Sequence, residues 1–264
     1  MITMDGKSIE DFGFYVEPGH EDPMTPEIER KTLSIPGMKG VWDFGTEIGE
    51  RPFAYPLMIM DRYHDDMQRE YNNLVAFLFD DFGQPREIKL VRNYEPDKFY
   101  MVKIAQQMVP ERLTEDGKLV LPFVASDPLK YSNTFGDEVF WGSEIITFEY
   151  NYLLGREGLD GSVSINGPQT LAIPIDGLAV QPVFEINGTA NNLTISANGY
   201  TFTLPNFTNT RWEIDFEKYI VYKNGQETMI EIREFYLMPG NNQVKVAGSN
   251  INLDMRIKFR DKYM

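Results

Sequence analysis

The feature that most constrains the fold is a series of Asn-Gly dipeptides set between short apolar runs in the second half of the chain. They occur at residues 166–167, 187–188, 198–199 and 224–225. This dipeptide readily adopts the positive φ angles that tight β-hairpins require. No long segment here has helical periodicity, so the pattern predicts short strands stacked as a two-sheet β-sandwich. The candidate strands are 171–175, 182–186, 193–196, 200–204, 212–216, 219–222, 229–237, 244–247 and 251–259.

The pattern of apolar and turn-forming residues changes near residue 126, which divides the chain into two parts. Residues 118–125 alternate in a way that is typical of a strand covered on both faces. The turn-forming run Ser126-Asp127-Pro128 then ends this strand, because proline supplies no N–H to a β-ladder. A length of 264 residues is enough for two cores. We therefore predict two domains, 1–132 and 133–264.

The first domain is expected to hold several strands and one helix. From about Tyr63 to Phe79, apolar residues recur at spacings of three and four, which predicts an amphipathic helix with Asp61 as its N-cap. A strand–helix–strand unit is not repeated, so a doubly wound fold is excluded. The predicted class is mostly β, with an N-terminal sandwich or split barrel carrying one α-helix. The predicted stripe consists of Met67, Tyr71, Leu74, Val75 and Leu78.

Residues 17–45 form a turn-rich, partly acidic segment. Its Pro36-Gly37 dipeptide fits a type II turn, which takes proline at the second position and glycine at the third. Glycines 40 and 45 flank an apolar run in which Trp42 is expected to anchor the core. Arg30 and Lys31 lie among acids, either as solvated charges or as partners for an acidic neighbour.

Composition excludes several classes of function. The net charge of -15 and the pI of about 4.6 argue against a protein that grips nucleic acid through its phosphates. The chain has no cysteine, which excludes disulfides and thiolate sites. The N-terminal residues lack the apolar run of a signal peptide, and no segment resembles a membrane span. The sequence therefore predicts a protein made in a cytoplasm, without membrane insertion.

The residues give no catalytic constellation. The two histidines, His20 and His64, lie in no serine triad, and no glycine-rich phosphate loop opens a helix. Asp61, His64, Asp65 and Asp66 could be offered as a metal cluster, but a helix start explains them. We predict no enzyme, no catalytic or metal site and no cofactor.

Two tryptophans of the second domain are candidate sugar-binding residues, because sandwich domains often bind sugars by stacking them on exposed aromatic rings. Trp212 alternates with Ile214 and Phe216, which places it in the core. Trp141 lies in an irregular aromatic stretch and stays open as a glycan contact.

Several segments in order resemble one family from end to end of the chain. They are LSIPGMKGVWDFG, the single helix after a strand, PFVASDPLKYS, PVFEINGTANNLTI, WEIDFEKYIVYKNG and FYLMPGNNQVKV. Together they resemble the distal tail proteins (Dit) of siphophages, the bacteriophages with long, non-contractile tails. The resemblance implies a virion structural protein of the tail tip or baseplate, with an N-terminal ring-forming domain and a C-terminal galectin-like β-sandwich.

The family role is a hub for host attachment. The resemblance implies a homo-hexameric ring, single or as two stacked rings, around a channel through which DNA passes. Its partners would be the major tail tube protein, the tail-tip, tail-associated lysin or fibre protein, and candidate receptor-binding proteins. We expect an acidic lumen to keep DNA from adhering. The candidate ring-interface residues lie in the turn-rich segment and are Arg30, Lys31, Pro36, Gly37 and Gly40.

The chain departs from true galectins in one respect. Their clustered sugar-contacting His, Asn, Arg and Trp have no counterpart here, so a sandwich scaffold is expected without lectin activity. The alternative function is a carbohydrate-binding baseplate module that engages host wall glycans through Trp141 or nearby tyrosines. A third class, a glycoside hydrolase, would need turnover on wall polysaccharide.

Overall fold

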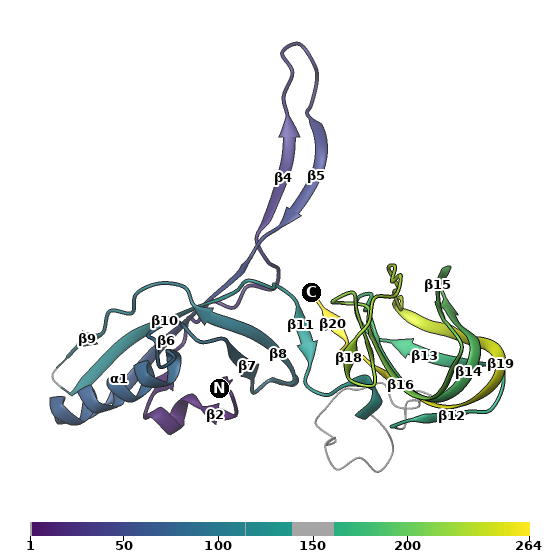
Figure 1. The fold of residues 1–264 in the computed structure, drawn as a ribbon. Coiled ribbons are helices and arrows are strands. Elements are labelled where there is room, and N and C mark those ends of the chain that lie inside the picture. The colour runs from purple at the N-terminus through teal and green to yellow at the C-terminus, as the bar shows by residue number, and fades with distance from the viewer. Residues whose placement is uncertain (1, 114, 139–160) are drawn as a thin grey trace. The chain divides into compact units, whose positions relative to one another are not determined.

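The protein is described by a computed structural model that covers residues 2–113, 115–138 and 161–264. The chain divides into two compact units, residues 1–130 and 131–263 (Figure 1). Both units consist mainly of β-strands, and α1 (His64–Leu78) is the one α-helix in the described ranges. The predicted mostly-β class is confirmed. The roles assigned to residues 1–132 and 133–264 stay predictions.

An antiparallel sheet forms the body of unit 1, in the order β2-β1-β7-β8-β10-β6-β3, with β9 on β10. Strands β6 and β10 pair over their full lengths, from Arg51 opposite Ala125 to Met60 opposite Asp116. The predicted cover on both faces of β10 is wrong at Val120, which is 50% exposed, because one face of the sheet meets solvent there. The strands are β1 (Ile2–Met4), β2 (Lys7–Ser8), β3 (Tyr15–Val16), β6 (Arg51–Met60), β7 (Ile88–Arg92), β8 (Glu95–Ile104), β9 (Glu111–Arg112) and β10 (Asp116–Ala125).

Helix α1 contributes its apolar stripe to the core of unit 1. Its buried residues are Met67, Tyr71, Leu74 and Leu78. The Tyr71 ring packs on the Phe14 ring with centroids 5.5 Å apart. A Cβ at Gly117 of β10 would overlap the Tyr71 hydroxyl, so glycine allows this strand to approach the helix closely.

Three details of unit 1 differ from the sequence predictions. Val75 is 45% exposed, because it lies at the border of the stripe. The N-cap is Tyr63, and Asp61 instead accepts a hydrogen bond from the Tyr63 N–H at 2.8 Å. The alternation of Phe12, Phe14 and Val16 in the sequence predicts a strand, but Ile9–Phe12 form the 3-10 helix η1, which ends at Gly13 with φ 78°.

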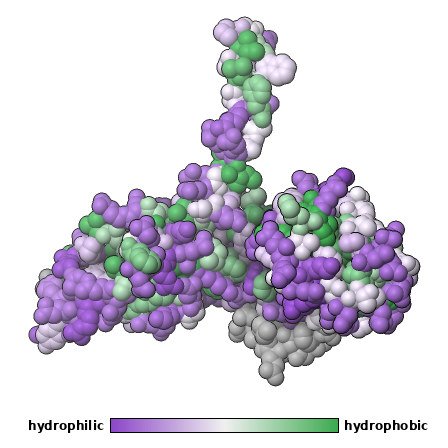
Figure 2. All heavy atoms as spheres, in the orientation of Figure 1, coloured by the Kyte–Doolittle hydropathy of each residue, from purple (hydrophilic) through white to green (hydrophobic). Residues whose placement is uncertain are grey.

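A two-stranded hairpin connects β3 to β6. Its strands, β4 (Ile28–Leu33) and β5 (Trp42–Ile48), pair with each other and with no other described strand (Figure 1). Figure 2 shows apolar surface along this hairpin. The prediction that Trp42 anchors the core is wrong, since Trp42 is 56% exposed. Among the residues that the structure describes, no second layer covers the hairpin.

Unit 2 is a β-sandwich made from one strongly bent sheet. The long strands β14 (Val183–Ala197) and β19 (Gly240–Lys258) pair along both of their halves. Their first and second halves have different outer neighbours, β16 and β15 for β14, and β13 and β12 for β19. Bulges near Gly188 and Asn191 let the sheet fold over. The other strands are β11 (Lys130–Ser132), β12 (Val163–Ile165), β13 (Gln169–Ile175), β15 (Tyr200–Leu204), β16 (Phe207–Asp215), β17 (Ile220–Lys223), β18 (Gln226–Glu227) and β20 (Lys262–Tyr263), with a 3-10 helix η2 (Gly136–Glu138).

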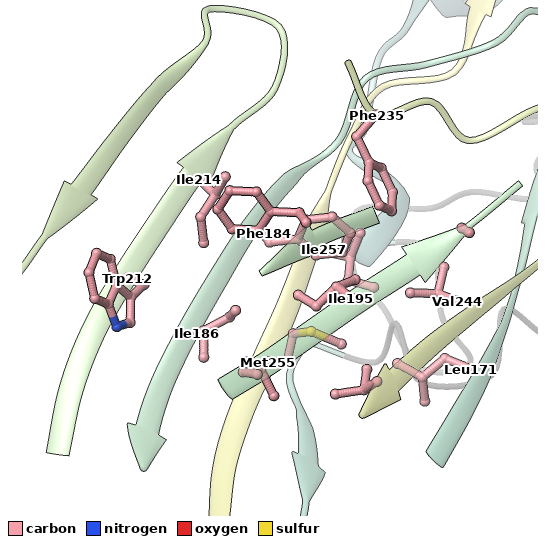
Figure 3. Close-up of a cluster of buried hydrophobic side chains, with 14 of the residues drawn as sticks. Leu171, Phe184, Ile186, Ile195, Trp212, Ile214, Phe235, Val244, Met255 and Ile257 are labelled. Atoms are coloured by element: carbon pink, nitrogen blue, oxygen red, sulfur yellow. The ribbon is translucent and has the colours of Figure 1, made fainter. Parts of the chain in front are cut away.

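The core of unit 2 lies between the two halves of this sheet (Figure 3). Phe184 packs edge-on against Phe216 and Phe235, with centroids 5.8 and 5.4 Å apart. Trp212 is 1% exposed, which confirms its predicted place in the core. The strand expected at 229–237 is absent from that described segment, and the strands expected at 193–196, 244–247 and 251–259 are parts of β14 and β19.

The Asn-Gly dipeptides have different outcomes. Asn198-Gly199, with φ 53° and 86°, and Asn224-Gly225, with φ 51° and 80°, form the predicted tight turns. Asn187-Gly188 is no turn, because it lies within β14. Gly188 has φ 148°, and a Cβ there would overlap the Asn252 carbonyl oxygen of β19. Glycine is needed there because the neighbouring backbone is close.

Candidate interaction surface

The register of the β4–β5 hairpin decides which side chains share a face. Leu33 lies opposite Trp42, Thr32 opposite Asp43, Arg30 opposite Thr46 and Ile28 opposite Ile48. The register shifts between Arg30 and Thr32, so Phe44 and Gly45 together oppose Lys31. This is a β-bulge, and Gly45 takes φ 102° in it.

Because of the bulge, the hairpin has two unlike faces. Alternation along each strand places Leu33, Trp42 and Phe44 on one face, which we call the aromatic face. Lys31 shares that face and pairs with Glu29 at 2.9 Å and with Glu47 at 3.1 Å. The aromatic face is therefore apolar toward the turn and charged toward the base.

The opposite face of the hairpin carries another ion pair, between Arg30 and Asp43. Arg30 Nη2 lies 2.7 Å from Asp43 Oδ2. This hydrogen bond, together with one from the Gly45 N–H, lowers the pKa of the Asp43 carboxyl. Ile28 and Ile48 lie beside this pair, at the base of the hairpin.

The tip of the hairpin follows the predicted turn chemistry. The Met38 N–H donates to the Ile35 carbonyl at 3.1 Å, which closes a four-residue turn around Pro36-Gly37. Gly37 has φ 87°, the value that the third position of a type II turn requires. The hairpin carries all five predicted interface residues: Arg30 and Lys31 lie in β4, and Pro36, Gly37 and Gly40 lie in the connection to β5.

Large apolar side chains are exposed along the whole hairpin. Their exposed fractions range from 40% at Met38 to 69% at Phe44. These side chains lie on both faces and at the tip, and the part on the aromatic face is the kind of apolar patch that marks interaction sites in soluble proteins. The residues are Ile28, Leu33, Ile35, Met38, Val41, Trp42, Phe44 and Ile48.

The segment that leads into the hairpin is fixed to the body of unit 1. The backbones of Glu21 and Ala54 exchange two hydrogen bonds, of 2.8 and 3.0 Å. Asp22 Oδ2 accepts hydrogen bonds from Arg92, at 2.6 Å, and from the Tyr94 hydroxyl. Arg92 also pairs with Glu95. The hairpin therefore starts from an anchored position.

Ion pairs stabilise this anchor, which consists of Asp22, Arg92 and Glu95. The side chains of Arg92 and Glu95 are 10% and 18% exposed. Burial alone would raise the pKa of Glu95, but hydrogen bonds from Lys98 and Lys130 and the charge of Arg92 lower it to about 2. Glu95 is therefore ionised at neutral pH, and its three cationic partners offset its desolvation.

A cavity of about 360 Å³ opens near this anchor. Its surface is almost wholly apolar, although the side chains that line it include His20, Asn93 and two tyrosines. The Tyr55 hydroxyl is buried and forms no hydrogen bond with the residues that the structure describes. Burial, together with the charge of Asp22, raises the pKa of Tyr55, so this hydroxyl stays neutral. The lining residues are Ile2, Val16, His20, Tyr55, Asn93 and Tyr94.

Trp141 lies outside the described residues. Within the described ranges, no three acidic or histidine side chains gather closely enough to hold a metal ion. In the same ranges, no helix has the length and apolar character that crossing a membrane requires.

Sequence reasoning missed the aromatic face because Trp42 was assigned to the core. A signal against that assignment was available in β4. Glu29, Arg30 and Lys31 are consecutive charges, so both faces of the strand carry charge, and neither face of such a strand can lie in a dry core.

Comparison with known proteins adds independent findings. Residues 5–125 match the family model described as a phage tail protein RIFT-related domain. No curated protein matches the chain. Among solved structures, the Dit protein of phage SPP1 is similar with a TM-score of 0.71 and 16% identity, over 100% of both chains. That protein is described as a hub of the adsorption apparatus in phages that infect Gram-positive bacteria.

Two structures of the phage P2 baseplate are more distant. They have TM-scores of 0.42 and 0.40 and 9% identity, over 96% of this chain and 92% of theirs. Likeness at this level carries no conclusion about the fold. The likeness to the SPP1 protein shows a shared fold over the whole chain, and the family match supports a structural role in a phage tail.

Proposed function

We propose, because residues 5–125 match the phage tail protein RIFT-related domain, that this chain is a distal tail hub. Six copies form a ring at the end of a long, non-contractile tail. One side of the ring joins the tail tube protein, and the other joins the tail-tip, lysin or fibre protein. Receptor-binding proteins are further candidate partners. The protein acts by assembly and docking within the virion, not by catalysis.

The observation that carries this proposal is the uncovered aromatic face of the β4–β5 hairpin. Leu33, Trp42 and Phe44 are 51%, 56% and 69% exposed. Exposed apolar area costs roughly 25 cal/mol per Å² relative to burial. A neighbouring copy that covers this face removes that cost, and a hydrophobic centre with a charged rim is the usual anatomy of a protein interface.

A ring follows from the kind of contact that a hairpin makes. The hairpin is a projection, so the surface that receives it is a different part of the next copy. Such head-to-tail contacts produce closed rings when the rotation between copies closes. The anchor of Asp22 on Arg92 supports this proposal, because it fixes the direction of the hairpin and reduces the entropy lost on assembly.

The charge of the chain fits a channel for DNA. A net charge of -15 repels phosphates, so DNA would pass an acidic lumen without adhering. If the residues that line the lumen of an assembled ring were mainly lysine and arginine, this part of the proposal would be wrong.

The experiment that tests the hub is electron microscopy of the purified chain. We expect class averages of a six-fold ring with a central opening, as a single ring or as two rings face to face. Particles of the size of one protomer at every concentration would contradict assembly by this chain alone.

A second candidate function, binding of wall glycans, has one observation in its favour. Unit 2 has a surface hollow of about 440 Å³ lined by Arg211, Glu213, Tyr222, Asn224 and Gly225. A tyrosine ring beside donors and acceptors is a common sugar-binding arrangement. Glycan-array binding that is lost in Tyr222→Ala or Trp141→Ala would favour this function, and an array without signal would remove it.

A further inference from the structure

The four Asn-Gly dipeptides share a chemical reactivity as well as a preference for turns. The backbone nitrogen of the glycine can attack the side-chain carbonyl carbon of the asparagine, which closes a five-membered succinimide ring and expels ammonia. Water then opens the ring at either carbonyl and leaves aspartate or isoaspartate. Glycine favours the attack because it has no side chain to obstruct its nitrogen. The reaction needs no enzyme, oxidant or cofactor, so the fold decides which of the four sites reacts.

Two of these asparagines are restrained by their side chains. The Asn198 amide donates hydrogen bonds to the Tyr236 carbonyl, at 3.2 Å, and to the Asn242 side chain. The Asn224 side-chain oxygen accepts a hydrogen bond from the Arg211 N–H at 2.9 Å. Neither side chain can turn toward the following nitrogen until these hydrogen bonds break, so both sites are protected.

The backbone protects Asn187 instead. This residue pairs with Arg211 of β16 and with Asp254 of β19, so its strand has a neighbour on each side. Ring closure would rotate the peptide bond between Asn187 and Gly188 out of the ladder. The β19 backbone lies close to Gly188, which leaves little room for that rotation.

Asn166 has neither restraint. It lies between β12 and β13, outside both strands, and its side chain is exposed. Among the residues that the structure describes, neither its side-chain amide nor the Gly167 N–H has a hydrogen-bond partner. A Cβ at Gly167 would meet nothing within 4 Å, so the turn has room for the ring.

We infer that Asn166 is the site at which this chain deamidates, through attack of the Gly167 nitrogen on its side-chain carbonyl carbon. In balance, asparagine and one water become aspartate or isoaspartate and ammonia. Either product carries a carboxylate that is ionised at neutral pH, so each event adds one negative charge to a chain of net charge -15. The inference is independent of the proposed hub.

The position of Asn166 gives the isoaspartate product a structural effect. Strands β12 and β13 pair with different parts of β19, residues 253–255 and 240–246. Asn166 therefore lies where the chain passes from one half of the bent sheet to the other. Isoaspartate lengthens the backbone there by one carbon atom, directly after Ile165, which is fully buried. The isoaspartate form should unfold at a lower temperature than the aspartate form.

Peptide mapping by mass spectrometry tests the site on the full chain, incubated at mildly alkaline pH. In the folded protein Asn166 should deamidate about tenfold faster than Asn187, Asn198 or Asn224, since a hydrogen bond that must break first slows a reaction by up to about that factor. In urea the four rates should become similar, because each asparagine precedes a glycine. An unreacted Asn166, or another of the four that reacts as fast in the folded chain, would overturn the inference.

Two variants test the ring mechanism. Gly167→Ala should slow deamidation at Asn166 severalfold, because the added methyl group obstructs the attacking nitrogen, and should not lower the unfolding temperature, because the Cβ has room. Asn166→Gln should form no acidic species at this site, since its longer side chain would have to close a six-membered ring. An unchanged rate in Gly167→Ala would mean that water hydrolyses the side-chain amide directly, which would overturn the assigned attack.

Thermal unfolding tests the structural effect. Aged chains that carry isoaspartate are separated by charge and by affinity for an isoaspartate-specific antibody, and Asn166→Asp is the matched control with the same charge and a normal backbone. We expect a lower unfolding temperature for the isoaspartate chains than for Asn166→Asp. Equal temperatures would show that the longer backbone is accommodated without strain and would overturn this part of the inference.

Discussion

Trp42 and Trp212 lie in strands of similar pattern but in opposite surroundings. Both alternate with other apolar residues along β5 and β16. Trp212 is 1% exposed and Trp42 is 56% exposed. The difference comes from what covers the strand, because the bent sheet of unit 2 supplies its own second layer, whereas no described part of the chain forms one over the hairpin. Alternation therefore predicts a strand with an apolar face, but it does not say which chain covers that face.

The largest expected effect concerns the two tryptophans. Trp212→Ala should lower the free energy of unfolding of unit 2 by about 3–5 kcal/mol, because it leaves a cavity in a closed core. Trp42→Ala should change the free energy of unfolding of the monomer by less than about 0.5 kcal/mol. Urea unfolding followed by circular dichroism under dissociating conditions measures both. Similar losses in the two variants would mean that the hairpin packs within its own chain.

Two glycines extend the same comparison to the backbone. Gly188→Ala should cost about 2–4 kcal/mol, because its Cβ would overlap the β19 backbone and the residue has positive φ. Gly45 also has positive φ, but a Cβ there would meet nothing within 4 Å. Gly45→Ala should therefore cost only about 1 kcal/mol of local backbone strain. Thermal unfolding of both variants measures which substitution lowers stability more. A larger loss in Gly45→Ala than in Gly188→Ala would mean that the hairpin is packed against other residues.

The anchor below the hairpin should make unit 1 sensitive to acid. The pKa of Glu95 is lowered from 4.5 to about 2 in the folded protein. Its contribution to stability is therefore complete above pH 4.5 and is lost as the pH falls toward 2. Glu95→Gln should cost about 1–2 kcal/mol at pH 7, less than the full shift corresponds to because the group is partly solvated.

The pH dependence provides the check on this contribution. Between pH 5 and pH 3, urea unfolding of Glu95→Gln should vary less with pH than unfolding of the unchanged protein. An equal dependence in the two proteins would mean that other carboxyl groups cause the acid sensitivity.

The smallest effect is expected for the ion pairs on the hairpin itself. Glu47, whose side chain is 69% exposed, pairs with Lys31. Glu47→Gln should change the stability of the monomer by no more than about 0.5 kcal/mol. A larger loss, measured by the same urea titration, would show that this pair is shielded from solvent within the monomer.

Local chemistry was predictable from the sequence where a residue determines its own conformation. The turns at Asn198-Gly199, Asn224-Gly225 and Pro36-Gly37 follow from backbone preferences, and α1 follows from its apolar stripe. The placement of the five interface residues on one hairpin is a structural observation, and their role in a ring stays a proposal.

The missed features depend on contacts between distant segments. Asn187-Gly188 is the same dipeptide as the two that form turns. It lies at a β-bulge within β14 instead, where the backbone of β19 passes close to Gly188. The cavity beside Tyr55 is built from residues as distant as Ile2 and Tyr94, which no local pattern connects. Trp42 was assigned to the core because local alternation does not reveal whether a second layer exists.

The most direct test of the central claim, that neighbouring copies cover the hairpin, is the mass of the protein in solution. Light scattering coupled to gel filtration should be measured over a series of protein and salt concentrations, for the unchanged chain and for Trp42→Ala. We predict six or twelve times the protomer mass of 30.5 kDa for the unchanged chain and a shift toward the protomer mass for Trp42→Ala. A single protomer at every concentration, or an assembly of unchanged size and strength in Trp42→Ala, would contradict the claim.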